Sequence, residues 1–579
     1  MSLAIQFRGK PLGLMAVALS IALGAPTGRD LPKPRQAGVS GQEMRQMIAS
    51  GSLAGLRWPD FSDLRASVDR VYAQNGYKPL WIKPDGRFGS QGHFLLTALR
   101  NAADKGLEPE DYDAALLMRW SSEADHEGRT DLGLTIAVMR YASALHEGRV
   151  DPRQVRFAIT PKQWLDPAPL VMELQRLPEN QLAARMAQLE PPFRRYRQTE
   201  AALRDYRQRA AREPVEMPKR PRLPLKPGQR YDDMPALAAR LALLGDGKTP
   251  AEGERRSVYE GEMVEGVKRF QAQHGLPADG TVGKETWRAL TTPLAQRVEQ
   301  LALTLERWRW IPETVYPAIV VNIPEFELRA YENRRMVLRM HVIVGKAYRH
   351  HTPVFEDELQ SVIVRPYWNV PLSIQVNEIV PAMRKNAGYL ARHDMMVVDQ
   401  RRQPVGGMGR QELLGSLASG AVRLQQRPGP ENSLGLLKFD FPNAYDVYMH
   451  GTPVQQLFAR ARRDFSHGCI RVADPLSLAE WVLRGQEEWT RERILEATAG
   501  DQTLEIPVRR KIAVLILYGT AVVEDEGQVH FYDDLYGLDA ELRKALDHGY
   551  PYPHMGRAAG RTVGTTGREA SARPGKETR

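Results

Sequence analysis

The apolar positions of the chain recur with a helical period through its first part. Between about residues 40 and 205 they return every three or four positions, as Leu134, Val138, Tyr141 and Leu145 do. Such spacing places apolar side chains on one face of a helix. We therefore predict a helical scaffold domain over residues 40–205 and expect no chemistry from it.

Prolines then break the pattern and mark a boundary. Five of them are closely spaced: Pro214, Pro218, Pro221, Pro224 and Pro227. Proline fixes φ and lacks an amide donor, so it interrupts helix and sheet alike. The segment 206–228 is predicted to be a stiff linker.

A compact unit with a helical period follows over residues 229–293. Val264, Val267 and Phe270 share one helical face, and Asp279-Gly280 is a tight-turn signal before a further short helix. The pattern predicts three short helices around a glycine-rich turn.

From about residue 313 the apolar period changes to two, which predicts strands. The clearest runs are 318–323, 326–331 and 336–344, and they indicate a mostly β domain over 313–505. The alternation stops between Pro371 and about Pro430. An insertion of this length, just before the segment with candidate chemistry, is typical of a cap over a site.

The two ends of the chain have their own compositions. Arg8 and Lys10 precede a short apolar run and then small residues, the order of a secretory signal peptide, which we expect at 1–24. The alternative is an uncleaved membrane anchor, although the run is shorter than the roughly 20 residues that span a bilayer. Export to the periplasm is the expectation. After an extension at 506–552, residues 553–579 form a basic tail expected to be disordered.

Charge and hydrophobicity narrow the function class only slightly. The net charge is +10 and 42% of residues are hydrophobic, which is ample for globular cores. Arg557–Arg579 contains six basic residues against two glutamates, so +4 of that charge lies in the tail. The remaining excess suits an anionic polymer or a plain basic surface. Nucleic-acid binding is not expected, because no nucleic-acid motif accompanies the charge.

The chain has one cysteine, Cys469, and it follows Ser466-His467-Gly468. A single cysteine cannot close an intramolecular disulfide, and an idle exposed thiol is a liability in an oxidising compartment. A second histidine, His450, stands upstream. A thiolate is the nucleophilic form of cysteine, and a nearby imidazole can take its proton. The pair predicts cysteine-dependent acyl transfer.

These motifs resemble a known family. His450-Gly451-Thr452 with the segment 466–471 resembles the signature of the L,D-transpeptidase (YkuD-type) catalytic domain. The sequence motif from Phe270 to Trp287 resembles that of the peptidoglycan-binding domain type 1. The order of segments is similar to that of the large Gram-negative members. The implied fold class is a multidomain α+β protein: a helical scaffold, a small three-helix peptidoglycan-binding domain, and a mostly β catalytic domain with a capping insertion.

The resemblance implies a cell-wall acyltransferase of peptidoglycan biosynthesis, with roles in cell-wall organisation and cell shape. Cys469 would attack a stem peptide before its terminal D-alanine, and a second stem would resolve the thioester as a 3→3 cross-link. His450 would be the general base, oriented by the Gly451 carbonyl. Backbone amides of His467, Gly468 and Cys469 would form the oxyanion hole. Carbapenems and penems are the implied covalent inhibitors.

Substrate binding is the less specific part of this prediction. Arg471 is expected to pair with a carboxylate, either of the substrate or of the domain itself. Tyr448 and Trp368 could line the substrate pocket, or they could be buried packing residues. Ser466 is also a candidate substrate contact. No cofactor and no metal are expected.

Three alternatives stay open. A hydrolase on the same fold would trim D-alanine or cut cross-links, because water and an amine compete for one thioester. A zinc site built from His450, His467 and Cys469 is conceivable, although the His-x-Cys spacing is poor for tetrahedral ligation. A non-catalytic wall-binding scaffold would be expected to have lost the cysteine or the histidine, and the sequence has both.

Overall fold

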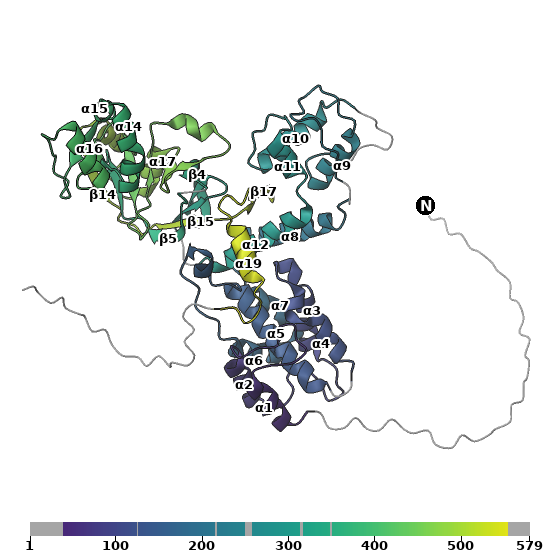
Figure 1. Ribbon diagram of the computed structural model, residues 1–579. Coiled ribbons are helices and arrows are strands. Elements are labelled where there is room, and N and C mark those ends of the chain that lie inside the picture. The colour runs from purple at the N-terminus through teal and green to yellow at the C-terminus, as the bar shows by residue number, and fades with distance from the viewer. Residues whose placement is uncertain are drawn as a thin grey trace, which may run out of the picture.

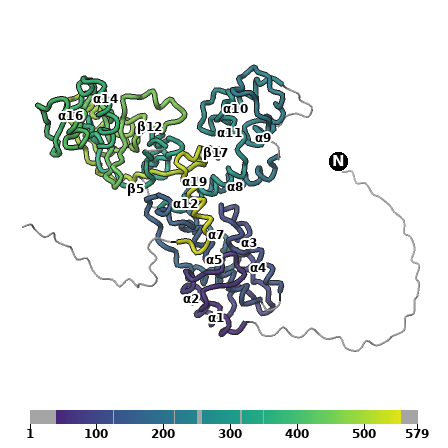
Figure 2. The backbone as a smooth tube through the Cα atoms, viewed as in Figure 1, coloured from purple at the N-terminus to yellow at the C-terminus, as the bar shows by residue number. Residues whose placement is uncertain are grey.

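The computed structural model describes residues 39–123, 126–214, 217–248, 257–312, 317–347 and 350–553. The predicted signal peptide lies outside these residues, as does the basic tail apart from residue 553. Figure 1 shows three lobes that meet around α8, α12 and α19. The tube in Figure 2 follows the chain through the helical lobe first, then the small helical unit, then the β-rich lobe.

The first lobe is helical, as the apolar spacing predicts. Helix α5 runs through its centre and is buried along nearly its whole length. Its Asp131 is fully buried and accepts hydrogen bonds from the Tyr72 hydroxyl and from backbone amides at Leu80, Trp81 and Ile82. The elements are α1 (Gly41–Ser50), α2 (Arg65–Gln74), α3 (Ser90–Arg100), η1 (Ala102–Lys105), η2 (Pro109–Tyr112), α4 (Ala114–Trp120), α5 (Glu127–Glu147), η3 (Pro152–Val155), β1 (Phe157–Ala158), α6 (Pro167–Arg176), α7 (Glu179–Ala187) and α8 (Arg194–Ala210).

The predicted linker is partly structured. Helix α8 continues to Ala210, because Tyr206 is buried with its ring 5.1 Å from that of Phe531. Further on, Leu225 forms an isolated bridge with Val282. Both ends of the proline-rich segment are therefore held by tertiary contacts.

The small unit has the three expected helices, α9 (Met234–Leu244), α10 (Glu262–Gln273) and α11 (Lys284–Leu290). Leu237, Val267 and Phe270 are fully buried in its core. The side chain of Gln271 fixes the glycine-rich turn, since it accepts from the Gly280 amide at 2.8 Å and donates to the Thr281 carbonyl at 2.9 Å.

Helix α12 (Leu294–Trp310) packs along α8 and connects this unit to the β-rich lobe. Its Glu306 is fully buried and pairs with Arg149 at 3.4 Å and with Arg309 at 3.3 Å. Removing one partner of such a buried group leaves an uncompensated charge, at a cost of about 3–5 kcal/mol. This contact therefore fixes the end of the scaffold domain against α12.

The third lobe is built on one large sheet. Its strand order is β1-β5-β15-β2-β3-β4-β13-β11-β10-β6-β14, and β12 pairs with β4. Helices α17 (Pro475–Val482) and α18 (Arg491–Ala499) follow strand β13. The strands are β2 (Ala318–Asn322), β3 (Glu327–Glu332), β4 (Arg335–Gly345), β5 (Val354–Glu358), β6 (Ser361–Val364), β10 (Leu437–Asp440), β11 (Met449–His450), β12 (Asp464–Ser466), β13 (Ile470–Val472), β14 (Leu504–Pro507) and β15 (Ala513–Leu517).

The segment 506–552 contributes a central strand to this sheet. Strand β15 lies between β2 and β5 and pairs parallel to β2 over five residues. It is followed by β16 (Ala521–Val523), β17 (Val529–Phe531) and α19 (Leu538–Leu546). The pairing is long-range, so the alternation of apolar residues along the chain could not locate it.

The insertion is a subdomain with its own core and, unexpectedly, its own three-stranded sheet of order β7-β9-β8. Val370, Ile379, Leu417 and Leu424 are buried inside it. Its elements are β7 (Trp368–Asn369), α13 (Leu372–Ile374), η4 (Gln375–Ile379), α14 (Val380–Lys385), α15 (Tyr389–Arg392), β8 (Met395–Val398), α16 (Arg410–Ser419) and β9 (Arg423–Gln426). Across the described ranges of the whole chain, no helix combines the length and apolarity needed to span a bilayer.

Candidate active site

Cys469 lies on a three-residue loop that joins two strands of the sheet. Strand β12 ends at Ser466, and β13 begins at Ile470. Both strands pair with β4, in parallel and antiparallel senses respectively, so the loop is anchored on each side. Cys469 is half-buried, and desolvation raises the pKa of its thiol. The neutral thiol is therefore the favoured form until a base accepts its proton.

Ser466 shapes this loop from within. Its hydroxyl donates to the Cys469 carbonyl at 2.6 Å and accepts from the Gly468 amide at 3.1 Å. Ser466 is 2% exposed, so its side chain supports the loop from inside and is not on a surface open to substrate. Gly468 has φ +118°, a conformation that side-chain-bearing residues rarely adopt.

Two residues outside the loop, neither of which was predicted from the sequence, hold it in place. Thr352 donates from its hydroxyl to the Gly468 carbonyl at 2.7 Å and accepts from the Gly345 amide at 2.9 Å. Tyr536 donates to the Gly345 carbonyl at 2.7 Å and accepts from the Thr352 amide at 3.3 Å. The segment that carries β15–β17 thus contacts the backbone of the cysteine loop through one intermediate residue.

His450 lies at the end of β11, whose register places it opposite Arg471 of β13. Its Nδ1 is 2.6 Å from the Gly451 carbonyl oxygen. A carbonyl only accepts, so Nδ1 carries the proton and Nε2 is left as an acceptor. Burial, followed by the Arg471 guanidinium, lowers the pKa of His450 to about 3. The imidazole is therefore neutral at ordinary pH.

Within the described residues the Cys469 thiol and the His450 imidazole are not joined by a hydrogen bond. The thiol instead donates to the Asp446 carbonyl, at 3.8 Å from Sγ. Tyr448 stands beside the thiol, and burial with the neighbouring Cys469 raises the pKa of Tyr448 well above its usual value. The Lys438 ammonium lies 4.3 Å from the centre of the Tyr448 ring and was not predicted as a site residue.

Arg471 has no carboxylate partner in the described part of the chain. Its Nε is buried without a hydrogen-bond partner. Burial lowers the pKa of Arg471, while the nearby Cys469 opposes that shift. Of the two expected partners for Arg471, a carboxylate of the domain itself is not found within the described ranges.

The capping subdomain contacts the cysteine loop directly. His467 Nε2 lies 2.5 Å from Oε1 of Glu378, which belongs to η4 of the insertion. The ring of His350 lies 4.7 Å from that of His467. Trp368, by contrast, packs against the core of the insertion, which supports its interpretation as a packing residue.

The zinc alternative has no geometric support. Among the residues that the structure describes, no group of three or more His, Cys, Asp or Glu side chains is arranged to hold a metal ion.

Comparison with protein families gives three domain matches. Residues 316–499 match the model of the L,D-transpeptidase catalytic domain. Residues 66–203 match a scaffold domain, and residues 230–290 match a model described as "Putative peptidoglycan binding domain".

The chain is also similar to individual proteins. A protein of Haemophilus influenzae named "Putative L,D-transpeptidase" is 31% identical over 249 residues, which is 43% of this chain. The chain spans about half the length of this curated relative, 49%. An L,D-transpeptidase structure from Xylanimonas cellulosilytica aligns with 53% of this chain and all of its own, at 15% identity and a TM-score of 0.17.

Proposed function

Because the chain carries an L,D-transpeptidase catalytic domain and a peptidoglycan-binding domain, we propose that it joins peptidoglycan stem peptides by 3→3 cross-links. The observation that carries the proposal is the loop of Cys469, held between two paired strands with His450 on the neighbouring one. We further propose that the protein acts in the periplasm, where its polymeric substrate lies.

The reaction needs two acyl transfers. The Cys469 sulfur attacks the carbonyl of the third stem residue, and the bond to the terminal D-alanine breaks. D-Alanine leaves as an amine that takes up the proton released by the thiol. An amine of a second stem then attacks the thioester, an amide forms, and the thiol regains its proton.

His450 is the proposed base of the first step. Its Nδ1 proton is given to the Gly451 carbonyl, so Nε2 is free to accept a proton. Its neutral state ensures that the acceptor is present at ordinary pH. Catalytic hydrogen bonds are often long without substrate, so the thiol would turn toward the imidazole when substrate binds.

The oxyanion hole is best assigned to the amides of His467 and Cys469. The Gly468 amide already donates to Ser466, whereas these two amides donate to no other group in the described residues. Each such donor is worth about 3–4 kcal/mol in transition-state stabilisation. Arg471 has no carboxylate partner among the described residues, and it is the proposed partner of a substrate carboxylate.

Product analysis tests the function. The purified full chain is incubated with disaccharide-tetrapeptide, and the products are separated and weighed by mass spectrometry. Cross-linked dimer with release of D-alanine is expected, and Cys469→Ala should form none. Tripeptide without dimer would mean that the enzyme is a hydrolase of the same bond. Dimer formed by a folded Cys469→Ala protein would overturn the assignment of the nucleophile.

A further inference from the structure

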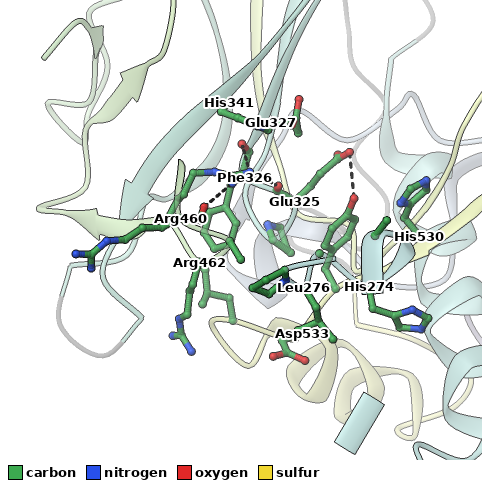
Figure 3. Close-up of a pocket in the computed structure, with 18 of the residues that line it drawn as sticks. His274, Leu276, Glu325, Phe326, Glu327, His341, Arg460, Arg462, His530 and Asp533 are labelled. Carbon is green, nitrogen blue, oxygen red and sulfur yellow. Dashed lines mark hydrogen bonds and ion pairs between the residues drawn. The ribbon is translucent and has the colours of Figure 1, made fainter. Parts of the chain in front are cut away.

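A large cleft separates the peptidoglycan-binding unit from the catalytic sheet, and it encloses about 1170 Å³. Drug-sized ligand pockets have about 300–1,000 Å³, so this cleft has room for a larger molecule. One wall carries His274, Leu276 and Pro277, which belong to the sequence motif of the small unit between residues 270 and 287. The facing wall is formed by Phe326 and the loop that includes Arg460 and Arg462, as Figure 3 shows.

The lining of the cleft combines apolar side chains with charged side chains of both signs. Five arginines face four carboxylates: Arg288, Arg339, Arg460, Arg462 and Arg463 against Glu285, Glu325, Glu327 and Asp533. Most of these charges are paired, as in Arg288–Asp533 at 2.6 Å and Arg339–Glu327 at 3.1 Å. A lining of this kind favours a neutral ligand over a strongly anionic one.

Two neutral imidazoles supply hydrogen-bond acceptors. The Nδ1 of His274 donates to the Phe270 carbonyl at 2.8 Å, so its Nε2 carries no proton. Burial holds the pKa of both His274 and His530 below the usual range. The ring of His530 lies parallel to that of Tyr532, whose hydroxyl donates to Glu325 at 3.4 Å. Flat apolar surfaces edged by neutral acceptors suit a ring that is apolar on its faces and carries hydroxyl and amide donors at its edge.

We propose that this cleft binds a stretch of the acetylated amino-sugar strand of peptidoglycan. The inference rests on the proposed function and assigns the sugar part of the substrate to a place shared by two domains. The loop with Arg460 leads through β12 into the loop of Cys469. The six residues from Arg463 to Cys469 can span at most about 20 Å. A sugar bound beside Arg463 would thus lie within about 20 Å of the backbone that carries the thiol.

The test exploits the single cysteine of the chain. In full-length Cys469→Ala protein, Ala459→Cys places one thiol on the exposed lining of the cleft for an environment-sensitive fluorophore. Ala183→Cys, on the exposed face of α7, carries the same label as the control. The probes are disaccharide-tetrapeptide, the N-acetylglucosamine tetramer and the free tetrapeptide.

Both sugar probes should give a saturable signal at position 459 and none at 183, and the free tetrapeptide should give none at either. Leu276→Asp, which puts a charge on the apolar wall, should raise the apparent Kd about tenfold or more. Ala461→Trp narrows the cleft from the facing wall and should act in the same direction. Leu495→Asp, at an exposed leucine of α18, should leave the apparent Kd within about twofold.

Absence of a signal with both sugars would overturn the inference. So would an equal signal from the free tetrapeptide, or an apparent Kd that folded Leu276→Asp and Ala461→Trp proteins leave unchanged. The failure of the proposed function looks different, because this assay needs no turnover. Dimer from the unmodified enzyme without a cleft signal rejects only the sugar site, whereas a cleft signal without product rejects only the transpeptidase activity.

Discussion

The imidazole of His467 and the carboxylate of Glu378 meet at 2.5 Å, and the two residues belong to different substructures. His467 is the first residue of the loop that carries Cys469, and Glu378 lies on η4 of the insertion. The capping subdomain is thereby connected to the backbone that carries Cys469. A cap held in this position can keep water from a thioester while leaving the acceptor amine a defined approach.

Glu378→Ala should therefore change the products more than it changes stability. Both side chains are partly exposed, so this contact contributes at most about 1 kcal/mol to folding. We expect the ratio of dimer to tripeptide to fall about threefold or more, because a looser cap admits water. Mass spectrometry of the products from disaccharide-tetrapeptide measures this ratio.

Glu412→Ala is the matched control for that experiment. Glu412 is an exposed glutamate of α16 in the same subdomain and makes no ion pair in the described structure. It should leave the product ratio unchanged. If Glu378→Ala protein keeps both the rate and the ratio of the unmodified enzyme, the contact does not govern access of water.

Tyr536→Phe tests whether the C-terminal segment positions the cysteine loop. The substitution removes the hydrogen bond to the Gly345 carbonyl and the acceptor for the Thr352 amide. The stability loss should be about 1–2 kcal/mol. Acylation of Cys469 should slow about tenfold, because Thr352 also holds the Gly468 carbonyl. The rate of acylation is followed by intact-mass spectrometry.

Tyr367→Phe gives the comparison, since Tyr367 is 44% exposed and its hydroxyl has no hydrogen-bond partner among the described residues. It should match the unmodified rate. A folded Tyr536→Phe protein that is acylated at the normal rate would mean that Tyr536 only stabilises the fold.

The sequence marks the candidate catalytic residues more clearly than it marks the residues that hold them in place. Cys469 and His450 stand out because a lone cysteine and a nearby histidine are local signals. Thr352 and Tyr536 act through long-range hydrogen bonds between backbone and hydroxyl groups, and no local pattern marks them. The same reason hides the strand pairing of β15, whose apolar run looks like any buried strand.

The insertion shows the same limit within one segment. Prolines and glycine mark its predicted boundaries near 371 and 430, but nothing along the chain marks its small sheet. Strand β8 has four residues and β7 only two, too few for alternation to be recognised. The contact of Glu378 with His467 depends on how the folded subdomain sits against the loop, which spacing along the chain does not encode.

The pH dependence of stability should reveal the buried neutral state of His450. Its pKa is about 3 in the folded protein against the ordinary value of 6.5. The unfolded chain therefore binds a proton below pH 6.5 that the folded state does not bind until about pH 3. The contribution of His450 to the free energy of unfolding is fully present above pH 6.5. It is lost as the pH falls from 6.5 to about 3. Between pH 7 and 4.5 the loss should be about 2–3 kcal/mol.

His450→Gln isolates this contribution, because glutamine does not titrate and other buried histidines, such as His274, are the same in both proteins. Denaturant unfolding of the two proteins at pH 7 and at pH 4.5 measures the difference. The variant should lose about 2 kcal/mol less than the unmodified protein over this interval. An equal loss in both would show that His450 takes up its proton over the same pH range in the folded protein as in the unfolded chain, and hence that its pKa is not lowered by burial.

A thiol placed for acyl transfer should also be acylated by strained β-lactams. We expect carbapenems and penems to open on Cys469, with its sulfur forming a thioester to the ring carbonyl and the ring nitrogen taking the proton. Intact-mass spectrometry should show one adduct per chain, and peptide mapping should place it on Cys469. Since burial raises the pKa of this thiol, the adduct should form much more slowly in His450→Gln protein, in which the proposed base is missing. An adduct on a serine, or none after long incubation of the unmodified chain, would contradict the assignment of Cys469 as the nucleophile. An adduct that forms equally fast in both proteins would leave the nucleophile in place and remove His450 from the first step.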